Sequence, residues 1–241
     1  MDTDAHSRWE AGLPDEIEFW RQILNGTFPN ADWVAGVRGR VAGQTPFPGD
    51  LIPHLKSGSI TRILDVGSGP VTTICPTAPS AIEVVATDPL ADVYNKLLDE
   101  NELRPSTRAL RVDGEHLSEF GLGLFDIVYS CNALDHTYDP VRVIREMVTV
   151  CNQDGVVFFV GHVNESVTQN GQGLHQWNFM PLDNGDLVIW QAHKLAVSLR
   201  CALGETVNVK ASGDVLYRVE IKHKTILSET PRVAWAGACG R

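Results

Sequence analysis

The chain has 241 residues, enough for one large domain or for one domain with an appendage. Hydrophobic residues make up 43% and charged residues 21%, which is typical of a globular protein and excludes a disordered composition. The formal net charge of -10 argues against a general nucleic-acid binder, because such proteins gather Lys and Arg on one face. Arg38 and Arg40 are too small a patch to change that, so we expect no nucleic-acid partner.

The cysteines and the apolar runs bear on the compartment of the protein. The 5 cysteines are scattered, odd in number and never spaced as C-x-x-C, which argues against a zinc ribbon, a redox motif or a disulfide scaffold. The start of the chain lacks a secretory signal, and the longest apolar run, near residues 156–160, is too short to span a bilayer. We therefore expect a cytoplasmic protein with no membrane partner.

The first 55 residues are predicted to be an appendage to the core of the chain. Ile17, Trp20, Ile23 and Leu24 follow helical spacing, and Asn25-Gly26 then ends the helix. Residues 26–50 are rich in Gly and Pro, which favours a loop or lid. We expect an N-terminal helical cap over residues 1–55 and a core domain over residues 56–241.

From residue 60 onwards, short apolar runs alternate with helical patterns. The predicted strands span residues 63–66, 82–87, 107–112, 125–130 and 155–161. The clearest helix covers residues 141–151, with Asp139 as its N-cap and Pro140 in its first turn. Continuous apolar strands separated by helices indicate a parallel sheet that is covered on both faces.

The pattern changes after residue 165. Residues 187–190, 206–210 and 215–222 alternate apolar and polar side chains, which predicts antiparallel strands added at the end of the sheet. The predicted fold class is therefore α/β, with a doubly wound, mainly parallel sheet, an N-terminal helical cap and antiparallel C-terminal strands.

Polar residues follow each predicted parallel strand. In such sheets, ligands bind outside the carboxyl ends of the strands. The first strand ends in Gly67-Ser68-Gly69, but a dinucleotide site would have a third glycine where Thr72 stands. Asp65 suits a cationic amino-acid ligand better than a pyrophosphate. Asp88 can accept both hydroxyls of a ribose, which suits either ligand.

Four motifs in order resemble those of the class I S-adenosylmethionine-dependent methyltransferases. They are I-L-D-V-G-S-G-P at 63–70, V-V-A-T-D-P-L at 84–90, R-V-D-G-E at 111–115 and F-D-I-V-Y-S-C-N-A-L-D-H at 125–136. The resemblance covers roughly residues 60–162. It implies S-adenosylmethionine as cofactor, a Rossmann-like methyltransferase fold, and a catalytic domain over residues 56–241 that binds S-adenosylmethionine. The residues that it implies for cofactor binding are Asp65, Gly67, Ser68, Gly69, Asp88, Pro89, Leu90, Asp113, Gly114, Glu115, Cys131 and Asn132.

The resemblance also implies a role for each group of these residues. Asp65 and the glycines would border the methionine part, and Asp88 would hold the ribose. Leu90 would pack on the adenine, whose edge would meet residues 113–115. The backbone of Cys131 and Asn132 would line the site near the sulfonium.

Candidate catalytic residues follow the fourth and fifth strands. If the acceptor is a hydroxyl, a general base assists, and His is the usual choice. His136 is the first candidate, with Asp135 beside it, although similar enzymes often carry a His here whether or not they need a base. His162 is the second candidate, or else a structural strand-end residue. Asp135, His136, His162 and Glu165 could form a hard-cation site, but no spacing requires it, so the metal is left unknown.

The acceptor site is predicted from the segment 171–179 and from the N-terminal helix. His175, Gln176 and Trp177 combine polar groups with a ring after a glycine-rich stretch, which suits a sugar or phenol unless the aromatics only anchor a loop. Glu165 is a further candidate for substrate contact. Trp20 either closes over the pocket or packs the helix on the sheet.

The function predicted from these features is methyl transfer to a small molecule, with O-methylation of a sugar or natural-product hydroxyl favoured because a His is available as base. The alternatives are N- or C-methylation of a small metabolite, a nicotinamide-dependent oxidoreductase, and a non-catalytic protein that binds an adenosyl ligand. A macromolecular methyltransferase fits the acidic charge less well. The sequence leaves the acceptor and the oligomeric state open.

Overall fold

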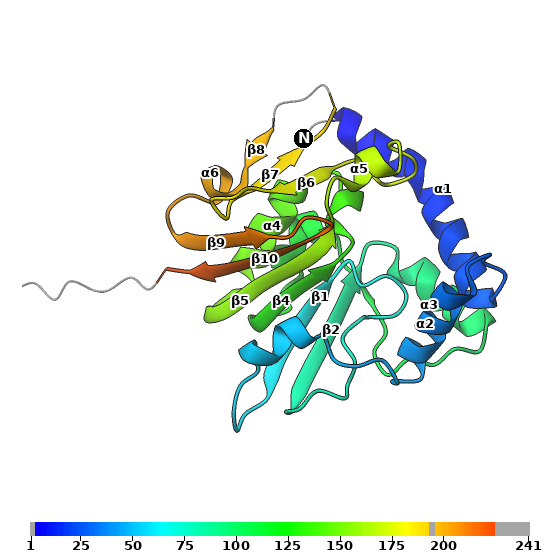
Figure 1. Ribbon diagram of the computed structural model, residues 1–241. Helices are drawn as coiled ribbons and strands as arrows, with labels where there is room; N and C mark the ends of the chain where they lie inside the picture. The colour runs from blue at the N-terminus through cyan, green and yellow to red at the C-terminus, as the bar shows by residue number, and fades with distance from the viewer. Residues whose placement is uncertain (1–2, 193–195, 225–241) are drawn as a thin grey trace, which may run out of the picture.

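The computed structural model describes residues 3–192 and 196–224 (Figure 1). Its strands are β1 (Thr61–Val66), β2 (Ile82–Asp88), β3 (Leu110–Arg111), β4 (Phe125–Cys131), β5 (Cys151–His162), β6 (Asn178–Pro181), β7 (Leu187–Trp190), β8 (Val197–Ser198), β9 (Val207–Ser212) and β10 (Leu216–His223). Its helices, with 3-10 helices written η, are α1 (Thr3–Asn25), α2 (Ala31–Val41), η1 (Gly49–His54), α3 (Ala91–Glu100), η2 (Gly114–Phe120), η3 (Leu134–His136), α4 (Pro140–Thr149), α5 (Glu165–Thr168) and α6 (Leu199–Leu203).

The described residues build a seven-stranded sheet in the order β3-β2-β1-β4-β5-β10-β9. The strands from β3 to β5 run parallel, whereas β10 is antiparallel to β5 and β9 is antiparallel to β10. The strand order reverses beside β1, so the loops after β1 and β4 leave the sheet next to each other. This topology confirms the predicted fold class and places the predicted site at the point of reversal.

Both faces of the central strands are buried, which explains their continuous apolar runs. Leu64 and Val128 point to the face that α4 covers, where they join the largest apolar cluster. Their chain neighbours Ile63 and Ile127 point to the opposite face, where they pack with Leu51 of η1. Alternation of side chains along a strand sends successive residues to opposite faces, so a sheet covered twice needs apolar residues at every position.

The helix before β5 begins as predicted and ends earlier. The Asp139 side chain accepts a hydrogen bond from the Arg142 backbone N–H at 3.0 Å, and Pro140 occupies the first turn. The prediction that the helix extends to Cys151 is wrong, because Cys151 is the first residue of β5 and pairs with Phe125. The third predicted strand is also shorter than expected. It is the two-residue edge strand β3, and short edge strands resist pairing with other chains.

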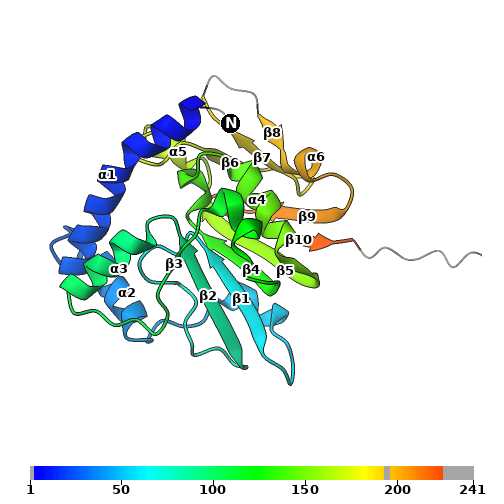
Figure 2. The ribbon, with the colours of Figure 1, turned by 180° about the vertical axis from the view of Figure 1, so that it is seen from behind.

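The N-terminal region is more helical than the sequence indicated. The predicted helix is the second half of α1, which starts at Thr3, and residues 26–50, predicted as a loop or lid, contain α2 and the start of η1. The Asn30 side chain caps α2 by accepting from the backbone N–H groups of Asp32 and Trp33, and Val37 buries its apolar side. In Figures 1 and 2, α1 runs along one side of the molecule from α5 to α2 and α3.

The C-terminal strands fall into two sheets. As predicted, β9 and β10 extend the main sheet in antiparallel fashion. The prediction that residues 187–190 do the same is wrong, because β7 pairs with β6 and β8 in a separate three-stranded sheet. Phe179, Leu187 and Ile189 of that sheet are buried in the apolar cluster around α4, so burial holds the second sheet on the first. Among the described residues, no helix has the length and apolar character to cross a bilayer.

The apolar face under α4 gives a direct test of the packing. Phe159 of β5 is fully buried there, and replacing it with Ala removes the ring and leaves a cavity. We expect Phe159→Ala to lower the free energy of unfolding by about 3–5 kcal/mol, measured by urea denaturation. The matched variant Leu124→Ala, at a side chain that is 52% exposed, should change it by less than about 0.5 kcal/mol. Equal effects of the two changes would contradict this packing.

Candidate active site

A cavity of about 850 Å³ lies at the carboxyl ends of β1, β2 and β4. Every residue that the sequence predicted for cofactor binding lines it, together with the predicted side chains Trp20, His136, His162, Glu165 and His175. The topology accounts for this convergence, because the loops after parallel strands all leave the same edge of the sheet.

The glycines after β1 allow the loop to pass close to its neighbours. Gly67 and Gly69 have φ values of 69° and 63°, a left-handed conformation that favours glycine. A Cβ atom on Gly67 would lie 2.5 Å from the Cβ of Ala133, which follows β4. A Cβ on Gly69 would lie 3.1 Å from the Trp20 ring of α1. The loop is therefore pressed between the strand-end segment after β4 and the N-terminal helix.

Asp65 offers a buried acceptor to this cavity. Its Oδ2 accepts a hydrogen bond from the Thr72 hydroxyl at 2.5 Å, and its Oδ1 has no hydrogen-bond partner among the described residues. Burial raises the pKa of Asp65 to about 6, against the opposing effects of the Thr72 hydroxyl and of Arg40. In the sequence, Thr72 marked only the absence of a third glycine, and Arg40 belonged to a small basic patch. In the structure, the Thr72 hydroxyl donates to Asp65, and Arg40 lines the cavity.

Asp88 ties the end of β2 to the glycine loop. Its carboxylate accepts from the backbone N–H of Gly69 at 3.0 Å and from that of Leu90 at 2.8 Å. Burial raises the pKa of Asp88 to about 7, although both backbone hydrogen bonds favour the ionised form. The side chain is thus fixed in place, and each carboxylate oxygen keeps acceptor capacity for a ligand hydroxyl.

Asp113 and Glu115 brace the opposite wall. The Asp113 carboxylate accepts from the Glu115 backbone N–H and from the Tyr138 hydroxyl, both at 3.0 Å. Glu115 Oε1 accepts from the backbone N–H groups of Tyr138 and Asp139 at 3.0 and 3.1 Å. Burial and the neighbouring Asp113 raise the pKa of Glu115. Glu115 thereby positions the segment after η3, and the adenine contact expected of these residues stays a prediction.

Asp135, His136 and His175 meet beside the cavity. His175 Nδ1 lies 2.8 Å from Asp135 Oδ2 and 3.0 Å from His136 Nε2, which is itself 3.5 Å from Asp135 Oδ2. Burial opposes the ionised form of Asp135, but the charge of His136 and the hydrogen bond from His175 outweigh it and lower the pKa of Asp135. Burial likewise opposes a charged His175, but Asp135, Glu165 and Glu16 raise the pKa of His175.

The other predicted site residues take separate places. His162 is half-exposed with its Nδ1 4.0 Å from Glu165 Oε2, so these two do not join the cluster of Asp135 and His136. Trp177 donates from its indole N–H to the Thr137 carbonyl at 2.8 Å and packs on the core, which is an anchoring role. The Gln176 side chain lines a second pocket.

Helix α1 forms a roof over the cavity. Trp20 covers the glycine loop, and its indole N–H donates to Glu16 Oε1 at 2.8 Å. A Cβ added to Gly12 would lie 2.7 Å from both the Gly173 carbonyl oxygen and the Leu174 side chain, so α1 packs tightly on that loop. The sequence pointed to Trp20 but missed Glu16 and Gly12, because only the path of α1 reveals their contacts.

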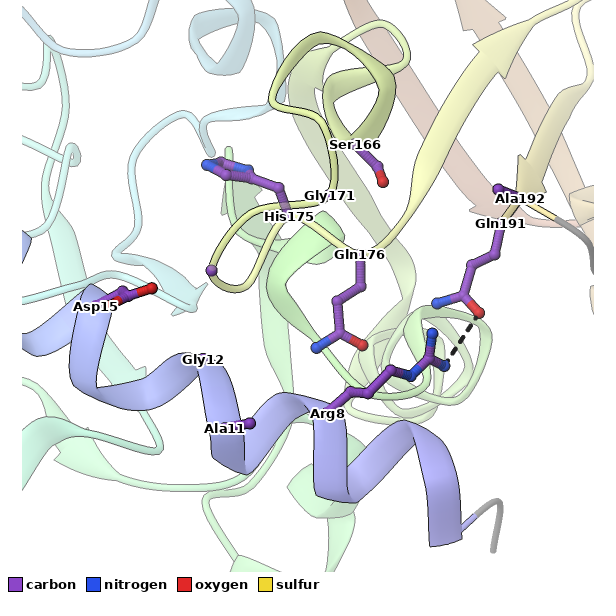
Figure 3. Close-up of a pocket in the computed structure, with 11 residues that line it drawn as sticks. Arg8, Ala11, Gly12, Asp15, Ser166, Gly171, His175, Gln176, Gln191 and Ala192 are labelled. Carbon is purple, nitrogen blue, oxygen red and sulfur yellow. Dashed lines mark hydrogen bonds between the residues drawn. The ribbon is translucent and has the colours of Figure 1, made fainter.

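The second pocket, of about 370 Å³, lies between α1 and the loop before β6 (Figure 3). The Gln176 side chain points toward α1, and both its amide nitrogen and its amide oxygen are buried without a hydrogen-bond partner among the described residues. The buried Gln191 accepts from Arg8 at 3.5 Å, while its own amide nitrogen has no partner within the part of the chain that the structure describes. Asp15, Gly173 and His175 line this pocket and the large cavity alike, so the two adjoin.

Residues 64–159 match a protein family described as a methyltransferase domain. This span runs from within β1 to within β5 and contains the glycine loop, Asp88, residues 113–115 and Asp135–His136. This match identifies residues 64–159 as a methyltransferase domain and supports the predicted class I S-adenosylmethionine-dependent methyltransferase. The match supports S-adenosylmethionine as the cofactor and favours methyl transfer over the alternative of a nicotinamide-dependent oxidoreductase.

Solved structures resemble this methyltransferase at low identity. A DhpI–SAH complex is 14% identical with a TM-score of 0.48, over 87% of this chain and 95% of that chain. The N-methyltransferase NodS from Bradyrhizobium japonicum WM9 is 13% identical with a TM-score of 0.46, over 78% of this chain and 96% of that chain. A ribosomal protein L11 methylase from Lactobacillus delbrueckii subsp. bulgaricus is 16% identical with a TM-score of 0.41, over 82% of this chain and 81% of that chain. No curated protein sequence matches the chain.

The residues of the methyltransferase's cavity fit this cofactor. The unpartnered Asp65 Oδ1 suits a cationic amino group, and the left-handed glycines leave room for close approach of the methionine part. The volume of about 850 Å³ lies within the usual range of small-molecule sites. S-adenosylmethionine supplies a methyl group carried on a cationic sulfur.

Asp88 gives a test with a pH signature. A protonated carboxyl accepts hydrogen bonds less well than a carboxylate, so cofactor affinity should rise as the pH passes upward through the pKa of about 7. We expect Asp88→Asn to weaken binding by about 1–3 kcal/mol at pH 8 and to flatten this rise, as measured by calorimetric titration with S-adenosylhomocysteine. The remaining pH dependence should be that of Asp65, near pH 6.

A matched control for this variant is Asp92→Asn, because Asp92 lies four residues further on and is exposed. Its titration should coincide with that of the unaltered protein. An Asp88→Asn protein with unchanged affinity and an unchanged pH profile would mean that the ribose is held elsewhere.

Proposed function

We propose that the methyltransferase methylates a hydroxyl group of a small polar molecule such as a sugar or a natural product. The observation that carries the proposal is the cluster of Asp135, His136 and His175 beside the cofactor cavity. Two imidazoles backed by a buried carboxylate suit a hydroxyl acceptor, which must lose a proton when its oxygen takes the methyl group. His136 belongs to the cavity wall, where the sequence placed the base.

The roof over the cavity supports a small acceptor. Contacts of Trp20 with the glycine loop and of Gly12 with Gly173 leave α1 lying across the site. A folded macromolecule has no broad approach to a reacting group beneath such a helix, and closure also excludes water. We propose on this basis that residues 1–55 act as a cap, although Phe47 and Leu51 near their end pack into the sheet face below.

The side pocket supports an extended, polar acceptor. A buried amide that lacks hydrogen-bond partners is costly, and a ligand that supplies a donor and an acceptor removes that cost. Gln176 therefore suits a hydroxyl or amide of the acceptor, while the reacting hydroxyl lies next to His136 and His175. The free cysteines Cys75, Cys131, Cys151 and Cys201 fit a reducing compartment, and we propose the cytoplasm.

A panel of acceptors tests the proposal. The protein is incubated with methyl-labelled S-adenosylmethionine and matched sugars, phenols and amines, and transferred label is counted. We expect label in hydroxyl compounds and none in the matched amines. Label in amines alone would contradict the proposal and favour the N-methylation alternative.

Gln176→Ala refines the same test. Loss of contacts to the acceptor should raise its KM about tenfold and leave the affinity for S-adenosylhomocysteine unchanged, since the side pocket lies outside the predicted cofactor residues. The matched variant Gln153→Ala, at an exposed position of β5, should change neither value. A Gln176→Ala enzyme with an unchanged KM would show that the side pocket does not receive the acceptor.

A further inference from the structure

We propose that Asp135, His136 and His175 form a binding site for one divalent first-row transition-metal ion. The site itself rests on geometry alone, and only the role of the ion rests on the proposed methylation of a hydroxyl. The cluster joins η3, which follows β4, with a loop about 40 residues later in the chain. The sequence did not predict this grouping, because it paired Asp135 and His136 with His162 and Glu165.

The three ligand atoms have the separations that one ion requires. They lie 2.8, 3.0 and 3.5 Å apart. Neighbouring ligands of an ion with bonds of about 2.1 Å are about 3.0 Å apart in octahedral and about 3.4 Å apart in tetrahedral geometry. The circle through these three atoms has a radius smaller than such a bond length, so one point can lie at bonding distance from all three.

Protons alone satisfy this arrangement poorly. A ring nitrogen carries at most one proton, yet His175 Nδ1 lies within hydrogen-bond distance of both a carboxylate oxygen and a second ring nitrogen. With Asp135 ionised, either one N–H of His175 faces two acceptors, or two lone pairs or two N–H groups face each other at 2.8 or 3.0 Å. A cation accepts all three lone pairs at once, with both imidazoles neutral.

The surroundings of the cluster favour a positive ion. Glu16 Oε2 lies 3.8 Å from His136 Nδ1, the nitrogen that faces away from the cluster. A carboxylate beside the outer nitrogen of a metal-ligating His is a common partner that fixes the orientation of the ring. The buried carboxylate of Glu165 also lies near enough to His175 to act on it electrostatically. Two imidazoles and one carboxylate suit Zn²⁺, Mn²⁺, Fe²⁺ or Co²⁺ better than Mg²⁺ or Ca²⁺.

The open side of the proposed site faces the large cavity, where we propose that the acceptor binds. His136 and His175 line the large cavity, and Asp135 lies behind them with its side chain only 4% exposed. Three protein ligands leave coordination positions on the cavity side, as in catalytic metal sites. There the ion would hold the acceptor hydroxyl and ease loss of its proton to water. The acceptor oxygen then forms the C–O bond while the C–S bond of the cofactor breaks and its electron pair stays on sulfur.

The test measures metal binding directly, without turnover. Full-length protein without a histidine tag is stripped with EDTA, dialysed and titrated with Co²⁺ and Zn²⁺ by calorimetry, and the Co²⁺ complex is followed by its visible absorption. We expect one ion per chain. His175→Gln and His136→Gln should each weaken binding at least tenfold and change the absorption. The control His162→Gln, in the same cavity but outside the cluster, should bind as the unaltered protein does.

Two outcomes would overturn the metal site: no saturable binding to the folded, stripped protein, or equal binding by the His175→Gln protein. Circular dichroism checks that each variant is folded. If one of the two His variants does not fold, metal binding by the other still tests the site. The acceptor panel, run with EDTA, separates this inference from the proposed function. Hydroxyl methylation in EDTA at the full rate contradicts the proposed role of the ion alone, whereas a bound ion in an enzyme that methylates only amines contradicts the proposed function alone.

Discussion

The close contact between the loop after β1 and the segment after β4 is the constraint on which the site depends. Gly67 meets Ala133 where the strand order reverses, and a side chain on Gly67 would collide with it. Because the two segments touch, Asp65 on one side and Asn132 on the other line a single cavity. The short helix η3 follows Ala133 and carries Asp135 and His136 to the same cavity edge.

The groups that face them divide the buried carboxylates of this edge into two kinds. Asp65 and Asp88 have raised pKa values because burial opposes their ionised forms, and we propose that they meet the cationic amino group and the ribose hydroxyls of the cofactor. Asp135 is equally buried, yet its pKa is lowered because His136 and His175 face it. The edge therefore has one part suited to the cofactor and one part suited to a proton or a metal ion, and α1 covers both.

Local patterns in the sequence predicted most of this edge. Apolar strands that end in Gly, Asp and Asn are short-range signals, and the parallel topology assembles them, so every predicted cofactor residue lines the cavity. The failures involve contacts that only the folded chain creates. Thr72 bonds to Asp65, His175 reaches Asp135 from 40 positions away, and α2 carries Arg40 to the cavity. The second sheet was missed because alternation in residues 187–190 predicts a strand and not its partner.

A crystal structure with S-adenosylhomocysteine tests the central claim most directly. The account predicts that the ligand lies against the Gly67–Gly69 loop, with its ribose hydroxyls on Asp88 and its amino group within hydrogen-bond distance of Asp65 Oδ1. Density for the ligand in the side pocket or on the surface, with the space between Gly67 and Asp88 empty, would contradict it.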